Sequence, residues 1–169
     1  HYEKMSCKRF LKQYPNLLIV NAFTKFYAMA GLRLGYLMTG DLSLLHAVAQ
    51  QLPEWNVSSI AQRAGISALK DTEYEKRTRQ LIEKERRYLI QEFLKMGCTV
   101  FPSEADYITF RLPQEKTGFL LKERLLEGKI LIRSCANYRN MPPDCYRIAV
   151  KQHADNEELV RQVWRILIR

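Results

Sequence analysis

The sequence predicts an α/β fold in two parts, and three observations support this. Residues 17–20 and 32–38 are short apolar runs that predict two strands, with a loop of small residues, 22–31, between them. Residues 42–96 repeat their apolar positions with helical spacing. From residue 98 onward, short strand-like runs alternate with short helical ones, which is typical of a smaller α+β layer.

The first part begins with an amphipathic segment, residues 2–14, which predicts a helix that ends before Pro15. The branched residues of 17–20 indicate a buried strand. Further helices are expected at 42–52, up to residue 69 after a cap by Ser58 or Ser59, and at 73–96, where Thr72 and Glu75 form a capping box. Gly97 is placed to end the longest of these helices.

The second part is expected to contain four strands and two helices. The strands are predicted at 98–101, 106–112, 129–133 and 145–150, and the first helix at 117–127. A terminal helix begins near Asp155, and its apolar stripe consists of Leu159, Val163, Ile166 and Leu167.

Composition narrows the function class of this 169-residue chain. It is 47% hydrophobic and 27% charged, which is typical of a globular protein, and no apolar run is long enough to span a membrane. The net charge of +9 raises nucleic-acid binding as a minor alternative. However, acids and bases alternate in residues 83–87, which indicates a solvated helix face. The pairs Glu73/Arg77, Glu75/Arg79 and Glu83/Arg87 are all spaced i,i+4. The four cysteines lack metal-ligand spacing, so reduced thiols and no metal site are expected.

Lys25 and Arg33 are the first candidate site residues. A lysine at the end of a buried strand loses hydration, which favours the neutral amine and makes it a nucleophile toward carbonyl carbon. Arg33 follows eight residues later and offers a permanent charge with a fork geometry suited to phosphate. Taken alone, Lys25 is better explained as a loop lysine with its amine in solvent, and Arg33 as a surface strand arginine. Together with the spacing of Gly31 and Gly35, the two residues favour a site.

The run TKFYAMAGLRLGY resembles the active-site segment of fold-type-I, pyridoxal-phosphate-dependent enzymes of the class I/II aminotransferase superfamily. The resemblance implies that Lys25 binds pyridoxal 5'-phosphate covalently and that Arg33 binds its phosphate. The family usually has a serine or threonine three residues before the lysine, where this chain has Ala22. Thr24 is expected to supply the missing hydroxyl.

Two arginines at strand ends extend the resemblance to the substrate. Arg147 in CYRIAV matches the arginine with which the family binds the substrate α-carboxylate, and Arg133 in ILIRSCANY lies where relatives bind a distal anion. Asn137 and Tyr138 are further candidates for the pocket lining. These segments are most similar to threonine-phosphate decarboxylases of cobalamin biosynthesis and to histidinol-phosphate aminotransferases.

The resemblance implies a C-terminal part of the fold-type-I large domain at 1–55, connecting helices at 56–96 and a small α+β domain at 97–169. The expected function is decarboxylation of L-threonine O-3-phosphate, with a histidinol-phosphate-type aminotransferase as the alternative. We expect a small phosphorylated amino acid as ligand, a cytoplasmic homodimer, and neither a membrane nor a nucleic-acid partner. The family's N-terminal half supplies the aspartate at the pyridine nitrogen, so these residues alone are expected to be inactive.

A noncatalytic aminotransferase-like module is the alternative from another class, because the same residues could serve only packing or assembly. The sequence leaves decarboxylation and transamination open, since the rotation of the bound substrate decides which Cα bond breaks.

Overall fold

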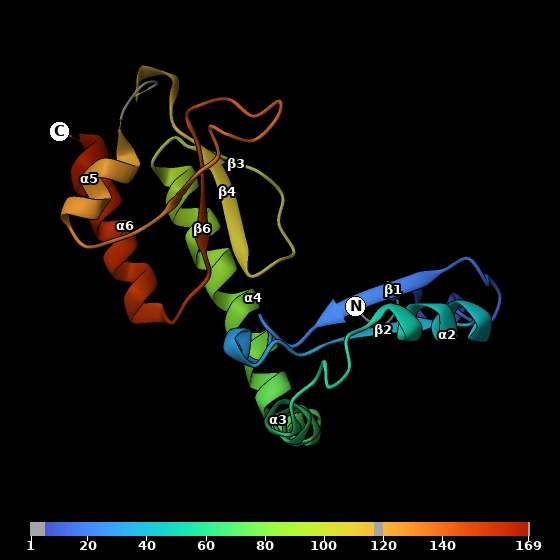
Figure 1. Ribbon diagram of the computed structural model, residues 1–169. Coiled ribbons are helices and arrows are strands. Elements are labelled where there is room, and N and C mark those ends of the chain that lie inside the picture. The colour runs from blue at the N-terminus through green and yellow to red at the C-terminus, as the bar shows by residue number, and fades with distance from the viewer. Residues whose placement is uncertain (1–5, 117–119, 169) are drawn as a thin grey trace. The chain divides into compact units, whose positions relative to one another are not determined.

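The computed structural model describes residues 6–116 and 120–168, and the chain divides into two compact units, His1–Thr72 and Glu73–Arg169. We call these the N-terminal unit and the C-terminal unit. Both combine helices with a sheet, which confirms the α/β prediction (Figure 1). The expected division at residues 55 and 96 stays a prediction.

The N-terminal unit is built on a β-hairpin. Strands β1 (Leu18–Ala22) and β2 (Gly35–Thr39) are antiparallel, with Leu18 opposite Thr39 and Ala22 opposite Gly35. Helix α2 (Leu42–Gln51) begins at Asp41, whose carboxylate accepts hydrogen bonds from two backbone amides of the first turn. Helix α3 (Ser59–Lys70) is capped in the same way by Ser58, as predicted.

The hairpin is far more exposed than the sequence led us to expect. Val20, in the strand predicted to be buried, is 71% exposed, and only Phe23 and Ala61 are buried hydrophobic residues among the described residues of this unit. The prediction of a buried strand is therefore wrong for this chain, because the hairpin is a two-stranded sheet within the described residues. The branched residues raise strand propensity, but burial requires a second layer.

The predicted helix 2–14 is only partly observed. Residues 2–5 lie outside the described residues, and the remainder contains a short 3-10 helix, Cys7–Phe10, capped by Ser6. A second 3-10 helix, Ala30–Leu32, lies in the loop between β1 and β2.

The C-terminal unit contains a four-stranded antiparallel sheet in the order β3-β4-β6-β5. The strands are β3 (Thr99–Val100), β4 (Tyr107–Arg111), β5 (Arg133–Ser134) and β6 (Cys145–Ala149), and the helices are α4 (Thr72–Lys95), α5 (Leu121–Glu127) and α6 (His153–Ile168), with a 3-10 turn at Gln114–Lys116. None of the helices in the described parts of the chain is long and apolar enough to cross a membrane.

One predicted strand of this unit is misplaced. Residues 129–133 were expected to form it, but β5 starts only at Arg133. The reason is that residues 129 and 130 close the end of α5: Lys129 has φ 61°, and the amides of Lys129 and Ile130 donate to the carbonyls of Leu126 and Leu125. Of the predicted helix 117–127, residues 117–119 lie outside the described residues.

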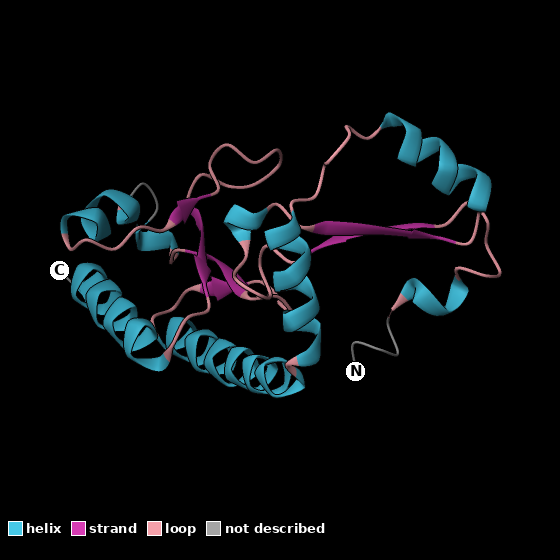
Figure 2. Cartoon of the chain, turned by 60° about the horizontal axis from the view of Figure 1, so that its bottom comes forward, coloured by secondary structure: helices cyan, strands magenta, loops and turns pink. Residues whose placement is uncertain are grey.

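The core of the C-terminal unit lies between one face of the sheet and helices α4 and α6, and helix α5 contributes Leu121 and Leu125 to it (Figure 2). Ile108 faces Ile148 and Phe110 faces Tyr146 across the β4–β6 ladder, so these four side chains share the core face. The rings of Phe93 on α4 and Phe110 are 4.3 Å apart. The predicted stripe of α6 is confirmed at Leu159, Val163 and Leu167, which are buried.

Helix α4 ends as predicted. Gly97 has φ 78°, a conformation that favours glycine, and the amide of Cys98 donates to the carbonyl of Phe93. Three of the four free cysteines, Cys98, Cys135 and Cys145, are buried. Burial raises the pKa of Cys98 to about 12, so this thiol is protonated and unreactive at neutral pH.

Residues 83–87 are only partly the solvated face that we expected. The ion pair between Glu83 and Arg87 is present, but Glu85 is only 1% exposed and Arg86 is buried, donating to the carbonyl of Ala105. The pairs Glu73/Arg77 and Glu75/Arg79 also form, with N–O distances of 3.9 and 2.7 Å. Alternating charge therefore predicted the pairs but missed two side chains that turn inward.

Buried Glu85 connects α4 to the start of α6. Its Oε2 lies 3.0 Å from Nδ1 of His153 and accepts a hydrogen bond of 3.0 Å from the side-chain amide of Asn156. Asn156 also bonds both the carbonyl and the amide of Lys151. Burial acts to raise the pKa of Glu85, but the bonds from Asn156 and His153 outweigh it and lower that pKa. The hydrogen bond with Glu85 raises the pKa of His153.

These shifts predict a pH window for the stability of the C-terminal unit. The stabilisation from His153 is complete below its unfolded pKa, about 6.5, and is lost as the pH rises through the higher folded pKa. The contribution of Glu85 is present above about pH 4.3 and is lost as the pH falls through its lowered folded pKa. We expect the difference in free energy of unfolding between wild type and His153→Gln to be largest between these limits. Denaturation with urea from pH 4 to 9 measures it, and a difference that grows above pH 8 would contradict the assignment.

Candidate active site

The loop that carries Lys25 is held by hydrogen bonds at its base. The amide of Phe23 donates to the carbonyl of Leu34, and the amide of Tyr27 donates to that of Phe23, at 3.0 and 3.2 Å. The buried ring of Phe23 stacks on Tyr27 with centroids 5.2 Å apart. The loop therefore has a defined conformation in which backbone bonds and one aromatic anchor fix the neighbours of Lys25.

Lys25 lies in the turn after β1, and its side chain is exposed. Its carbonyl accepts a bond from the amide of Ala28, while its ammonium group has no hydrogen bond or ion pair with residues 6–116 or 120–168. The loss of hydration that we expected for this amine is therefore not produced by the described residues. Adjacent Thr24 is half-buried, and Ala22, at the position of the usual hydroxyl residue, is the last residue of β1.

Arg33 lies at the other end of the same loop, two residues before β2. Its backbone has φ 54°, a left-handed conformation that costs about 1–3 kcal/mol in a residue other than glycine. One guanidinium nitrogen, Nη1, donates to the carbonyl of Ala30 at 3.1 Å. The other N–H groups have no partner within the described residues, which leaves a positive charge and free donors at the side of the loop where β2 begins.

Arg147 and Arg133 lie together on the C-terminal unit. They are directly opposite each other in the β5–β6 ladder, and both stand on the face of the sheet that points away from α4 and α6. We call this the outer face. Residues paired in this way have Cα atoms about 4.5–5.5 Å apart, so the two cationic side chains are neighbours. Next to them, Thr109 of β4 faces Arg147.

Both arginines are in contact with aromatic rings. The guanidinium carbon of Arg147 is 4.8 Å from the ring centroid of Tyr107, and that of Arg133 is 5.5 Å from the centroid of Tyr138. Arg133 also donates a bond of 3.3 Å to the side chain of Asn137. Neither arginine forms an ion pair with a carboxylate among the described residues, so the outer face holds two adjacent positive charges.

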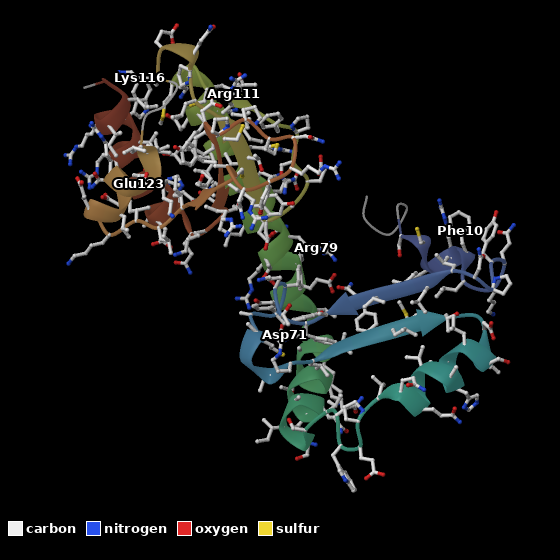
Figure 3. The ribbon with its side chains drawn as sticks, turned by 45° about the horizontal axis from the view of Figure 1, so that its top comes forward. Phe10, Asp71, Arg79, Arg111, Lys116 and Glu123 are labelled. Atoms are coloured by element: carbon white, nitrogen blue, oxygen red, sulfur yellow. The ribbon has the colours of Figure 1, made fainter. Side chains whose placement is uncertain are left out.

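A third arginine of the outer face behaves differently. Arg111, labelled in Figure 3, is at the end of β4, and its Nε donates to Oδ2 of the buried carboxylate of Asp144 at 2.8 Å. This hydrogen bond raises the pKa of Arg111. The charge of Arg111 is thus neutralised, whereas the charges of Arg133 and Arg147 are not.

The structure thus groups the candidate residues in two places. Thr24, Lys25 and Arg33 share one loop of the N-terminal unit, and Arg133 and Arg147 share one sheet face of the C-terminal unit. Asn137 and Tyr138 lie beside Arg133, as the sequence suggested. The sequence analysis missed Tyr107, although the period-two pattern of β4 places residues 107, 109 and 111 on the same face.

Comparison with known proteins shows what the chain is similar to. Residues 2–163 match the family model described as aminotransferase class I and II. The threonine-phosphate decarboxylase of Salmonella typhimurium is 35% identical over 158 residues, which cover 93% of this chain and 43% of that protein. The crystal structure of the histidinol-phosphate aminotransferase from Clostridium acetobutylicum is 32% identical and superposes with a TM-score of 0.91 over 98% of this chain and 50% of that one.

The chain therefore spans half, or less, of the length of these two proteins. The same fold, at 22% identity and a TM-score of 0.81, occurs in the histidinol-phosphate aminotransferase of Sinorhizobium meliloti, solved in complex with pyridoxal-5'-phosphate; the match covers 91% of this chain and 42% of that one. The cofactor of the family is pyridoxal phosphate. Both the match of residues 2–163 to the family model and the shared architecture show that this chain belongs to the class I and II aminotransferase family of fold-type-I, pyridoxal-phosphate-dependent enzymes.

Proposed function

We propose that this chain is the C-terminal portion of a pyridoxal-phosphate-dependent enzyme that acts on an amino acid carrying both a carboxylate and a phosphate, and that it decarboxylates L-threonine O-3-phosphate. The observation that carries the proposal is the adjacent pair Arg133 and Arg147, which the described residues leave without a carboxylate partner. Two like charges side by side repel each other, and a doubly anionic ligand removes that cost.

The residues of the loop fit the cofactor. An amine without an ion pair, as on Lys25, can condense with an aldehyde, and the free N–H groups of Arg33 suit a phosphate. We assign Lys25 to the carbonyl carbon of pyridoxal phosphate, and Arg33 with the hydroxyl of Thr24 to its phosphate. When bound, the cofactor serves as a sink for the electron pair of a bond that breaks at the substrate Cα.

The arginines decide which bond breaks. Arg147, as the residue that binds the α-carboxylate, and Arg133, as the residue that binds the phosphate, together fix the rotation of the substrate. In decarboxylation the carboxylate leaves as CO2, and the amine of Lys25 then returns a proton to Cα. Histidinol phosphate has a phosphorylated hydroxymethyl group in place of the carboxylate, so it carries one anionic group and only one of the two arginines would have an anion to bind.

A histidinol-phosphate-type aminotransferase is the second candidate, because a relative of that name is 32% identical. Transamination also requires an oxo acid, and its carboxylates could use the same arginines. In that reaction Lys25 would remove the Cα proton as a general base instead of returning one. We expect activity, whichever reaction applies, only from the complete protein, since this chain spans half or less of these two relatives. A cytoplasmic homodimer is the assembly that the family resemblance implies for it.

Lys25 is expected to be the lysine that binds pyridoxal phosphate. The complete protein that carries these residues is incubated with the cofactor, reduced with borohydride and digested, and the peptide masses are measured. We expect the mass increase on the peptide with Lys25, because its amine has no competing ion pair with the described residues and because Arg33 on the same loop can bind the cofactor phosphate.

Three variants accompany this experiment. Lys25→Ala should lose the modified peptide, whereas Lys12→Ala, which removes another exposed lysine of the same unit, should keep it. Arg33→Ala should raise the concentration of cofactor needed for half-maximal labelling at least tenfold, since a hydrogen bond to a charged group contributes about 1.5–3 kcal/mol. Equal labelling of Lys12 and Lys25 would refute the assignment and would favour a noncatalytic module.

The reaction is tested with two substrates. The complete protein is given L-threonine O-3-phosphate and, separately, histidinol phosphate with an oxo acid. Release of CO2 from the first supports the decarboxylase, whereas amino transfer from the second, without CO2 release from the first, would replace it with the aminotransferase.

A further inference from the structure

The contact between Arg147 and Tyr107 has a definite geometry in the sheet. Tyr107 faces Ala149 across the β4–β6 ladder, and Arg147 is two residues before Ala149, so Tyr107 and Arg147 are diagonal neighbours on the outer face. The guanidinium lies over the ring at 4.8 Å from its centroid. Directly opposite Arg147 is Thr109, whose small side chain cannot cover the guanidinium in this way.

An aromatic ring can hold an arginine side chain in place while its charge and its N–H donors stay available for a ligand. A carboxylate partner, such as Asp144 for Arg111, accepts a hydrogen bond and neutralises the charge. The face of a ring attracts the cation electrostatically but leaves the N–H groups at the edge of the guanidinium free. The side chain of Arg147 is thus restrained and still able to donate two parallel bonds to a planar anion.

The side chain of Tyr107 contributes neither to the hydrophobic core nor to a hydrogen bond among the described residues. It lies on the outer face and is partly exposed, so it is not part of the core. Its hydroxyl makes no hydrogen bond within residues 6–116 and 120–168. The aromatic face is therefore the property of this residue that the neighbouring arginine uses.

We propose that Tyr107 is a positioning residue for the substrate anion: its ring holds the guanidinium of Arg147 in place, so that the carboxylate of the substrate meets an arginine that is already ordered. This rests on the proposed role of Arg147 in carboxylate binding. This arrangement increases the affinity for the substrate, because the conformational entropy of the long arginine side chain is lost before the substrate arrives and not on binding.

The first test uses NMR on the 169-residue chain and does not depend on any reaction. The Nε–H signal of Arg147 is assigned by its disappearance in Arg147→Lys. We expect an upfield ring-current shift and a high heteronuclear NOE in wild type and in Tyr107→Phe, which keeps the ring. Tyr107→Leu should lose both, while Tyr138→Leu, which removes the ring beside Arg133, should leave the Arg147 signal unchanged. An unchanged signal in Tyr107→Leu would overturn the proposal.

The second test measures the KM for L-threonine O-3-phosphate in the complete protein. Tyr107→Leu should raise KM about two- to fivefold with little change in kcat, the effect of one exposed cation–π contact, and Tyr107→Phe should not. Arg147→Ala separates the two hypotheses. If Arg147→Ala raises KM and Tyr107→Leu does not, the positioning role is refuted and the proposed function stands. If neither does, Arg147 is not the carboxylate residue and both are refuted.

Discussion

Replacing Glu85 with alanine is expected to lower the free energy of unfolding of the C-terminal unit by about 2–4 kcal/mol. The substitution leaves the side-chain amide of Asn156 and Nδ1 of His153 without the carboxylate oxygen that both contact at 3.0 Å. Because Asn156 also holds the backbone of Lys151, the loss extends to the turn between β6 and α6. A buried group that loses its partner costs more than the net value of the original bond.

The measurement can be confined to the C-terminal unit. The chain has two tryptophans: Trp164 packs against the core of that unit, and Trp55 of the N-terminal unit is 94% exposed. In a Trp55→Phe background, fluorescence during urea unfolding therefore reports on Trp164 alone. Glu83→Ala is the matched control, because within the described residues this neighbouring glutamate forms one exposed ion pair, with Arg87, and its loss should change stability by less than about 1 kcal/mol. Equal effects of the two substitutions would show that the Glu85 network is not stabilising.

Phe93→Ala is expected to have the largest effect on stability, a loss of about 3–5 kcal/mol in the same unit. Phe93 is completely buried, and its ring packs against Phe110 of β4 at 4.3 Å. Truncation removes a contact between α4 and the sheet and leaves a cavity that the antiparallel ladder cannot easily close.

Leu94→Ala provides the comparison for this prediction. Leu94 is the next residue of the same helix but is 54% exposed, so its truncation should cost less than about 1 kcal/mol. Leu94→Ala keeps the helix propensity nearly constant, and Phe93→Ala raises it because alanine is a better helix former than phenylalanine, so helix propensity cannot account for a loss of stability in either variant. If Phe93→Ala were no more destabilising than Leu94→Ala, the described core would be wrong.

Much of the fold could be predicted from the sequence where local signals determine it. The serine cap of α3, the end of α4 at Gly97 and the buried stripe of α6 all depend on residues close to one another in the chain. The misplaced strand at 129–133 shows where local signals fail. The short apolar run predicted a strand, but the backbone amides at its start form hydrogen bonds that close the end of α5.

The candidate site residues differ in how the sequence could reveal them. Lys25 and Arg33 stand in one short motif, so their presence on one loop follows from their spacing. The neighbourhood of Arg133 and Arg147 depends on the register between β5 and β6, which a single sequence does not contain. Glu85 resembled its solvated neighbours, since only the position of α6 decides that this one carboxylate is covered.

The uncovered hairpin of the N-terminal unit has a consequence for how the chain unfolds. Its strands carry a row of ladder hydrogen bonds in direct contact with water, supported by little apolar packing among the described residues. Amide protons at residues 18–39 should then exchange with solvent far sooner than those of β4 and β6. The heat absorbed in a calorimetric scan should come almost entirely from the C-terminal unit. The enthalpy of unfolding should then be smaller than a folded domain of 169 residues would give.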